Sequence, residues 1–486
     1  MLPTALLDHT HTICAISTPP GRGGIAVVRV SGNRAVEMVS KIWSGHDLAI
    51  APTHTAHFGQ IVDGDQVLDQ AVATLFRAPR SYTGEDVVEL SVHGSLYVQQ
   101  RLLQLLVDAG CRLAHPGEFT RRAFIAGKID LAQAEAVADI IASTSGAAQK
   151  LAMNQMSGAL SKRIDTLRDK LIELASLLEL ELDFSEEDVE FASRTALLNL
   201  AKEIETILQN LKNSYHTGRA IIDGITVMLA GVPNAGKSTL LNRLVDTDRA
   251  IVSPLAGTTR DIIDDTTEID GILFRIADTA GLRADTIDAI EQQGIERAMD
   301  RARQASIILY LFDITAPLQE QTRTFSRLAE AIETHNANNQ TTHVLPVINK
   351  TDLQQPATLS RLSDRLSHLF ALHTSGALQI APAVLHSHND QNTLKNLRHT
   401  LGDIARDLLG QSNSEGVVLT NARHQTAVAE AIEHLRQTIS ALNSQLPPDL
   451  TAQHLRAAIQ SLGTITGAIT SPQILNTIFT RFCIGK

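Results

Sequence analysis

The chain has 486 residues, which is enough for two or three domains that each bury a core of their own. Hydrophobic residues make up 43% and charged residues 20% of it, and no run approaches 18 apolar residues, so we expect a cytoplasmic protein without a membrane partner. The net charge of −11 gives the protein a negative electrostatic field, which disfavours binding of nucleic-acid phosphates. An RNA partner would therefore require a local basic patch or a second protein. Three widely spaced cysteines disfavour a disulfide framework.

The first 120 residues mix short β-like runs with Gly and Pro punctuation. We expect strands near Ile25–Val30, Ala71–Phe76 and Val87–Val92, and a helix near Leu96–Asp108. This pattern is typical of an α+β domain, which we place at residues 1–120.

Helical spacing of apolar residues follows from Leu131 to about Leu211, and the alanine-rich run Leu131–Ala142 fits a buried helix. Asn213–Gly224 reads as a linker into a different domain. We place the first part of an all-α domain at residues 121–221.

Helical spacing returns at Thr420–Leu442 and again from Leu450 to the end. Two helical blocks that flank a different pattern indicate an insertion. We therefore expect an α/β domain at residues 222–406, inserted into a helical domain whose second part spans residues 407–486.

Residues 231–238 read Gly-Val-Pro-Asn-Ala-Gly-Lys-Ser, a complete phosphate-loop pattern. The loop follows the apolar run Ile225–Ala230, typical of a buried parallel strand, and helical spacing continues over Ser238–Val245. The anion would therefore lie at a helix N-terminus. Lys237 would reach the β- and γ-phosphates and Ser238 would ligate Mg²⁺. The strand–loop–helix context disfavours the alternative of a glycine-rich turn without a ligand.

Two further segments follow in the order of the switches of a GTPase. Ala256-Gly-Thr-Thr259-Arg-Asp offers Thr259 as a hydroxyl ligand for Mg²⁺. Asp278-Thr-Ala-Gly281 ends the apolar run Ile272–Ala277, which places a carboxylate near the metal and a Gly N–H near the γ-phosphate.

The last segment, Asn349-Lys-Thr-Asp352, ends the apolar run Val344–Ile348. A carboxylate at Asp352 accepts hydrogen bonds from N1–H and N2–H₂ of guanine, whereas adenine would leave it unpaired. Four motifs in this order predict a GTP site. Its predicted contacts are Asn234, Ala235, Gly236, Lys237, Ser238, Thr239, Ser253, Pro254, Leu255, Ala256, Gly257, Thr258, Thr259, Asp278, Thr279, Ala280, Gly281, Asn349, Lys350, Thr351 and Asp352.

Further motifs extend over nearly the whole chain. They are Thr18–Ile25 (TPPGRGGI), Ser81–Leu90 (SYTGEDVVEL), Pro116–Phe124 (PGEFTRRAF), Gly127–Leu131 (GKIDL) and the terminal Phe482–Lys486 (FCIGK). Together with the GTPase segments they closely resemble the MnmE, or TrmE, family of tRNA uridine-modification GTPases.

The resemblance implies a homodimer whose α+β N-terminal domain dimerises and binds a folate one-carbon donor, 5-formyl- or methylene-tetrahydrofolate. It also implies an FAD-dependent partner, called MnmG or GidA, with which such proteins add an aminomethyl or carboxymethylaminomethyl group to C5 of the wobble uridine of tRNA. The family's folate contacts correspond to Arg29, Glu89, Lys128 and Lys486, where cations suit the glutamate tail and a carboxylate suits the pterin edge. Cys483 would face the one-carbon unit.

Hydrolysis needs a polar group that orients water, because Leu282 stands where small GTPases commonly carry Gln. The resemblance gives this role to Glu291, so the expected catalytic residues are Glu291, Lys237 and Asn234. A K⁺ ion would supply the charge of an arginine finger when two GTPase domains meet. Its oxygen ligands would come from Asn234, Ser253, Leu255 and Thr258.

Two functions remain open at this point. The first is a GTP-hydrolysing component of a tRNA-modifying complex. The second is a regulatory switch in ribosome or RNA assembly, in which the GTP state gates binding and no base is modified. The N-terminal motifs and the tail with Cys483 favour the first.

Overall fold

The computed structural model describes the residues 11–183, 194–246, 265–278, 302, 305–335, 342–351, 378–380, 391–410, 417–444, 448–480 and 482–485. The chain divides into two compact units. The first is Met1–Ile141, Met153–Thr206 and Thr426–Lys486, and the second is Ala142–Ala152 and Ile207–Gln425. Each boundary between these units falls inside a helix, so the units do not test the domain limits predicted from the sequence, and those limits stay a prediction.

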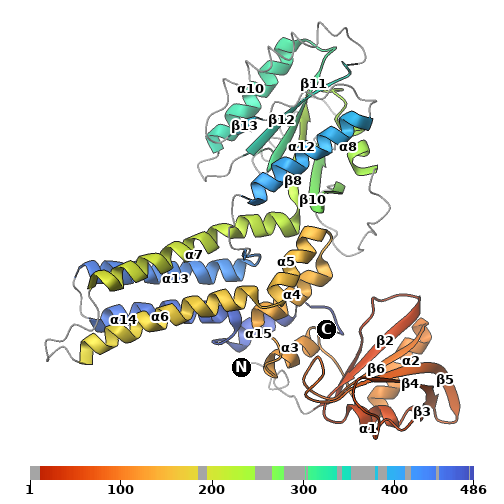
Figure 1. The fold of residues 1–486 in the computed structure, drawn as a ribbon. Helices are drawn as coiled ribbons and strands as arrows, with labels where there is room; N and C mark the ends of the chain where they lie inside the picture. Colours follow the sequence, from red (N-terminus) through yellow and green to blue (C-terminus); the bar gives the residue numbers. More distant parts are fainter. Residues whose placement is uncertain are drawn as a thin grey trace. The chain divides into compact units, whose positions relative to one another are not determined.

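A seven-stranded sheet forms the N-terminal part of the first unit (Figure 1). Its strands are β1 (Ile13–Ile16), β2 (Gly23–Ser31), β3 (Trp43–Gly45), β4 (Thr55–Asp63), β5 (Gln66–Phe76), β6 (Val87–Gly94) and β7 (Arg112–Leu113). The spatial order is β3-β4-β5-β6-β2-β1-β7, and only β1 and β7 pair in parallel. The three strands predicted in this region are confirmed as β2, β5 and β6.

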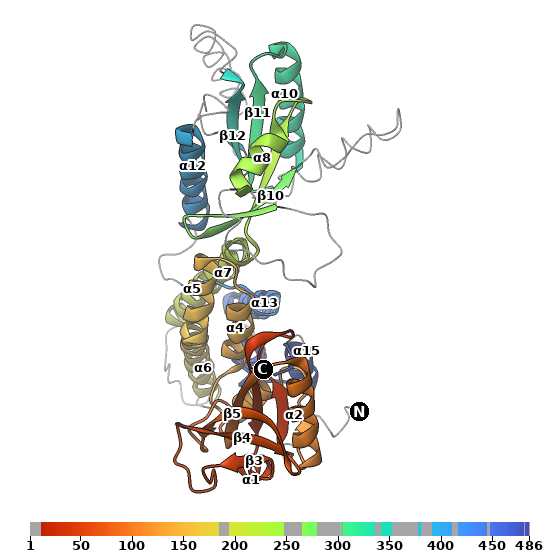
Figure 2. The same cartoon turned by 90° about the vertical axis from the view of Figure 1, so that its right-hand side faces the viewer.

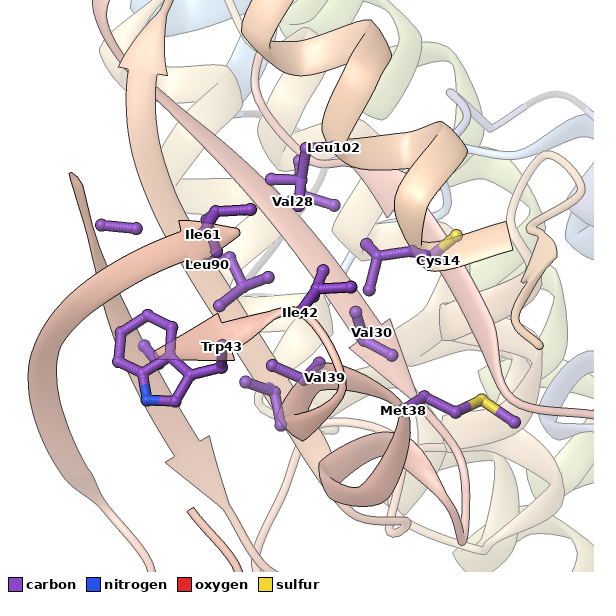
Figure 3. Packing of buried hydrophobic residues seen from close by; sticks show 14 of the residues in the cluster. Cys14, Val28, Val30, Met38, Val39, Ile42, Trp43, Ile61, Leu90 and Leu102 are labelled. Atoms are coloured by element: carbon purple, nitrogen blue, oxygen red, sulfur yellow. The ribbon is translucent and has the colours of Figure 1, made fainter. Parts of the chain in front are cut away.

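Helices α1 (Ala35–Ser40) and α2 (Leu96–Asp108) supply buried residues to the core on one face of this sheet. Alternate residues of β2 face it, and Figure 3 shows Val28 beside Leu102 of the predicted helix α2, with Leu90 of β6 near Ile61 of β4. Burying each such side chain contributes about 1.5–3 kcal/mol. The other residues of β2 and β6, including Arg29 and Glu89, lie on the opposite face.

The rest of the first unit is helical. Its helices, with those that continue into the second unit, are α3 (Glu118–Ile125), α4 (Leu131–Ala142), α6 (Ala159–Asp183), α7 (Arg194–Asp223), α13 (Ala422–Asn443), α14 (Pro448–Thr466) and α15 (Pro472–Phe479). Helices α6 and α14 pack along each other. The predicted helix Leu131–Ala142 is confirmed as α4. In the part of the chain that the structure describes, no helix combines the length and apolar character needed to cross a bilayer.

The linker predicted over Asn213–Gly224 was wrong, because α7 continues to Asp223. The small and polar residues that resembled a linker pack against the backbone of Leu419. Ser214 Oγ accepts a hydrogen bond from Leu419 N at 3.1 Å, and a Cβ added at Gly218 would lie 2.0 Å from the Leu419 carbonyl oxygen. Gly218 therefore permits a close approach of two backbones within a continuous helix.

A six-stranded sheet forms the centre of the second unit. Its elements in chain order are β8 (Ile225–Gly231), α8 (Lys237–Asp246), β9 (Asp265–Ile269), β10 (Ile272–Asp278), β11 (Ile307–Asp313), α10 (Leu318–His335), β12 (Thr342–Asn349), β13 (Leu378–Ile380) and α12 (Gln391–Gly410). The strand order is β13-β12-β11-β8-β10-β9, and every pair except β9–β10 is parallel. Helix α5 (Gly146–Met156) begins in this unit.

Helices cover both faces of this sheet, as Figure 2 shows for α12 and α10. Alternate residues of β11 explain the two layers: Leu309 and Leu311 pack with α8 and α12, whereas Tyr310 and Phe312 pack with α10. The predicted α/β domain between helical segments is therefore confirmed. Parallel strands also bring the carboxyl ends of β8, β10, β11 and β12 to one edge of the sheet.

Candidate functional site

The phosphate-loop pattern lies between β8 and α8 at this edge. Asn234 has a φ of 62° and Gly236 a φ of 97°, so the backbone enters the left-handed region twice. Loops with this alternation form concavities that bind anions. A Cβ added at Gly236 would lie 2.3 Å from Asn349 Nδ2, so only glycine fits there.

Lys237 extends back over the loop. Its Nζ donates to the carbonyl oxygens of Gly231 and Val232, both at 3.0 Å. An ammonium group held there by neutral acceptors can transfer to the stronger acceptors of a phosphate. Ser238 and Thr239 follow in the first turn of α8 and are exposed. A hydroxyl group at this position can ligate a hard cation such as Mg²⁺ beside a phosphate bound at the helix N-terminus.

Asn349 and Lys350 follow at the end of β12. Asn349 Nδ2 donates to the Ala235 carbonyl oxygen at 2.7 Å, which joins this motif directly to the phosphate loop. Lys350 has a φ of 61°, and its Nζ donates to Asp313 Oδ2 at 2.6 Å. The structure therefore brings two motifs separated by more than 100 residues into one site.

Asp313 is a residue of this site that the sequence analysis did not single out. It ends β11 directly beside Asn349 in the parallel register, and its side chain is buried. Burial alone would raise the pKa of Asp313, but hydrogen bonds from Lys350 and Thr315 hold this pKa below its ordinary value. The signal was present in the sequence, because a single carboxylate directly follows the apolar run of β11 at its carboxyl end.

Asp278 ends β10 at the same edge, beside Leu229 of β8. Thirteen other predicted site residues lie outside the described part of the chain, so their roles remain proposals. They are Ser253, Pro254, Leu255, Ala256, Gly257, Thr258, Thr259, Thr279, Ala280, Gly281, Glu291, Asp352 and Lys486. Within the described ranges, no three His, Cys, Asp or Glu side chains gather as a metal site.

A second candidate site lies in the N-terminal domain, where Arg29 of β2 stands directly opposite Glu89 of β6. Arg29 Nε donates to Glu89 Oε1 at 2.9 Å, and Arg29 Nη2 lies 2.8 Å from the same oxygen. The structure thus brings together two of the four predicted folate contacts. Lys128 instead donates through Nζ to the Pro79 carbonyl oxygen at 2.9 Å.

Two aromatic rings hold Arg29, and neither was expected from the sequence. Its guanidinium carbon lies 5.6 Å from the ring centroids of both Tyr82 and Phe119. Tyr82 is anchored in turn, because its hydroxyl lies 2.9 Å from Thr120 Oγ1. Cation–π contacts of this kind favour a fixed, charged guanidinium group.

The C-terminal tail lies against the same domain. Helix α15 and Phe482 pack on Leu131 and Ala134 of α4. Cys483 is exposed, and its carbonyl oxygen accepts from Gly117 N at 3.4 Å. Ser17 Oγ donates to the Gly485 carbonyl oxygen at 3.2 Å. Ser17 follows β1, whose Ala15 is the register partner of Arg29, so the tail ends near the Arg29 side of the sheet.

Comparison with known proteins covers both sites. The model of the TrmE N-terminus, described as a GTP-binding protein, matches residues 12–128, and that of the MnmE helical domain matches residues 131–483. The tRNA modification GTPase MnmE of Cytophaga hutchinsonii is 42% identical over 488 residues and covers 100% of both chains. The protein of that name from Parabacteroides distasonis is 43% identical over 482 residues, with 98% of this chain and 100% of the relative covered.

Among solved structures, a GTP-binding protein from Sulfolobus solfataricus in complex with GDP is 18% identical. The match covers 50% of this chain and 67% of that structure's chain, with a TM-score of 0.27. The curated relatives, in contrast, are similar over the full length of this chain. The chain belongs to the MnmE family of tRNA modification GTPases.

Proposed function

We propose that this GTPase hydrolyses GTP as one component of a complex that modifies C5 of the wobble uridine of tRNA. The observation that carries the proposal is the bond from Asn349 Nδ2 to the Ala235 carbonyl oxygen. It joins the base-recognition motif to the phosphate loop in a chain whose full-length relatives are named tRNA modification GTPases.

The residues predicted for this site have the chemistry that GTP requires, and Asn234, Lys237 and Ser238 among them lie in the described part of the chain. Lys237 places its charge on the β- and γ-phosphates, and Ser238 with Thr259 holds Mg²⁺. Asp352 reads the guanine edge, and Glu291 orients the attacking water through a bridging water. K⁺ on Asn234 and on the backbone oxygens of Ser253, Leu255 and Thr258 offsets the charge that develops during hydrolysis.

We propose that the N-terminal site binds a tetrahydrofolate, which supplies the one-carbon unit when bound. Glu89 can accept from the amino-pyrimidine edge of a pterin while Arg29 is held by Tyr82 and Phe119. Lys128 and Lys486 supply cations for the glutamate tail. Cys483 faces the one-carbon unit from the docked tail.

We also propose that a second copy of the chain covers the face of the N-terminal sheet that lies opposite α1 and α2. Phe58, Val72, Ser91 and Val27 form one row across β4, β5, β6 and β2. Phe58 is 68% exposed and its register partner Val72 is 36% exposed, so two apolar side chains lie together on this face, and contiguous exposed apolar area marks interaction surfaces. The row adjoins that of Arg29 and Glu89, so the dimer would border the folate site. Phe58→Glu should lower the dimer fraction in light scattering, whereas Ile50→Glu, in the loop before β4, should not.

The partner in modification would be the FAD-dependent protein called MnmG or GidA. A net charge of −11 disfavours tRNA binding by this chain's overall field, so we assign part of the RNA-binding surface to that partner.

Mass spectrometry of tRNA nucleosides tests the proposed function. A deletion strain should lose the modified wobble uridine, and the wild-type gene should restore it. Lys237→Ala should fail to restore it, while Lys202→Ala, an exposed lysine on α7, should succeed. Unchanged nucleosides in the deletion strain would instead favour a regulatory switch in ribosome or RNA assembly.

A further inference from the structure

Three arginines surround one buried carboxylate at the start of α3. Glu118 Oε1 accepts from Arg112 Nη2 at 2.5 Å and from Arg122 Nη2 at 3.1 Å. Glu118 Oε2 accepts from the backbone N of His115 at 2.9 Å. Arg122 also bonds both carboxylate oxygens of Glu85. Both oxygens of Glu118 are therefore already engaged by hydrogen bonds.

Arg121 is the third arginine, and its position differs from that of the other two. The residue is only 8% exposed, yet its buried Nε and Nη2 atoms have no hydrogen-bond partner. The nearest carboxylate contact is Glu118 Oε1, 4.0 Å from Nη2. Among the described residues, these three guanidinium groups contact two carboxylates, Glu118 and Glu85, so the partly buried cluster has one more positive than negative charge. Burial also lowers the pKa of Arg121, as expected for a cation with too little compensation.

The location of Arg121 connects it to the proposed folate site. Its backbone N bonds the Gly117 carbonyl oxygen, and Gly117 N bonds the Cys483 carbonyl oxygen. Gly117 also lies against Phe479, the last residue of α15. Residues four apart share a helix face, so Arg121 projects from the side of α3 that meets the tail. Phe119, which holds Arg29, is two residues earlier and projects from the other side of α3, so it is the tail that connects Arg121 to the site.

We infer that Arg121 binds an anion in this site, and that the anion is a carboxylate of the tetrahydrofolate. The inference rests on the proposed function. A carboxylate can accept two hydrogen bonds from one guanidinium group, which would satisfy both unpaired nitrogen atoms. The glutamate tail of folate carries two carboxylates; Lys486 is proposed to take one, and Arg121 would take the other.

A pair of ligands isolates this role. Calorimetric titration of the full-length protein with 5-formyl-tetrahydrofolate is compared with the amide of 5-formyl-tetrahydropteroate, which lacks the glutamate and carries no carboxylate. Arg121→Gln should weaken folate binding by about 10- to 100-fold, the usual effect of losing a charged hydrogen-bonded contact, and leave binding of the pteroate amide unchanged. Arg121→Lys should fall between, because lysine keeps the charge but not the two-pronged geometry. Arg34→Gln, an exposed arginine paired with Glu37, is the control.

Thermal unfolding distinguishes this role from a structural one. Arg121→Met removes an uncompensated buried charge, so its melting temperature without ligand should equal or exceed that of the wild type. A clear drop in melting temperature, or an equal loss of affinity for both ligands, would overturn the inference in favour of a structural arginine. Intact folate binding with lost tRNA binding in a gel shift would overturn it in favour of a phosphate contact.

The two proposals fail in different ways. A wild-type protein that binds neither ligand would remove the folate function, and the inference with it. A wild-type protein that prefers folate, beside an Arg121→Gln variant with the same preference, would remove the inference alone.

Discussion

Asp313 and Lys350 end two neighbouring parallel strands, and Lys350 Nζ donates to Asp313 Oδ2 at 2.6 Å. The carboxylate is held in turn by the backbone N and the hydroxyl of Thr315. Gln321 bonds both backbone polar groups of Asp313. Lys350 belongs to the motif that should recognise guanine, so its ion pair with Asp313 holds the Lys350 side chain in position within the nucleotide site.

Asp313→Ala should therefore weaken GTP and GDP binding by about 10- to 100-fold, because it leaves Lys350 without its charged partner. Asp313→Asn keeps an acceptor for Lys350 and Thr315 and should lose less. Titration with a fluorescent guanine nucleotide measures both variants, and Glu320→Ala on the neighbouring helix is the control. An Asp313→Ala protein with wild-type affinity would show that the pair does not position Lys350.

The same ion pair predicts how nucleotide affinity responds to pH. The folded-state pKa of Asp313 lies below its ordinary value of 3.8, so its stabilising bond is present above that value and is lost as pH falls through the lower, folded-state pKa. The difference in guanine-nucleotide affinity between wild type and Asp313→Asn should then stay constant between about pH 5 and pH 8. A difference that changes across this interval would argue that Asp313 titrates there.

Nucleotide choice should depend on Asp352. Asp352→Asn turns an acceptor into a donor at one position, so the variant should lose GTP and gain xanthosine triphosphate, which has a carbonyl where guanine has an amine. Competition of both nucleotides, and of ATP, against a labelled guanine nucleotide measures the exchange. Equal binding of ATP and GTP by the wild-type protein would refute the assignment.

Hydrolysis should be much faster in K⁺ than in Na⁺, because K⁺ would provide the charge of an arginine finger, an effect of about 10³–10⁵ in rate. Asn234→Gly is the sharper test, because Asn234 has a φ of 62° and glycine adopts that conformation without strain. The variant should lose most of the K⁺ response and keep nucleotide affinity. Steady-state phosphate release in the two salts measures the response, and equal wild-type rates would remove the K⁺ site.

Cys483→Ser should reduce the modified wobble uridine to near the level of a deletion strain and leave GTP hydrolysis near normal. The reason is that Cys483 docks by Gly117 in the N-terminal domain, whereas the phosphate loop is built from other residues. Nucleoside mass spectrometry and a phosphate-release assay give the two readings. Ile484→Ala, an exposed neighbour, should change neither. Normal modification in Cys483→Ser would make the tail purely structural.

Local patterns alone determined the strand, loop and helix around Lys237, because an apolar run, two glycines and helical spacing act between residues adjacent in the chain. The same holds for the apolar runs that became β10 and β12. Such signals also identified the inserted α/β domain and, with the motifs, the family.

Tertiary structure alone decided which distant residues meet. Asp313 reaches Lys350 only because β11 and β12 pair in parallel, and Arg29 is held only because α3 brings Phe119 to its strand. Gly218 is the clearest example of what local sequence cannot predict. In the sequence it indicated a break between domains, yet it lies within the continuous helix α7. Glycine is required there because the Leu419 carbonyl oxygen approaches too closely for any side chain. Propensity is a weak local preference, and the packing of a segment more than 200 residues away overrides it.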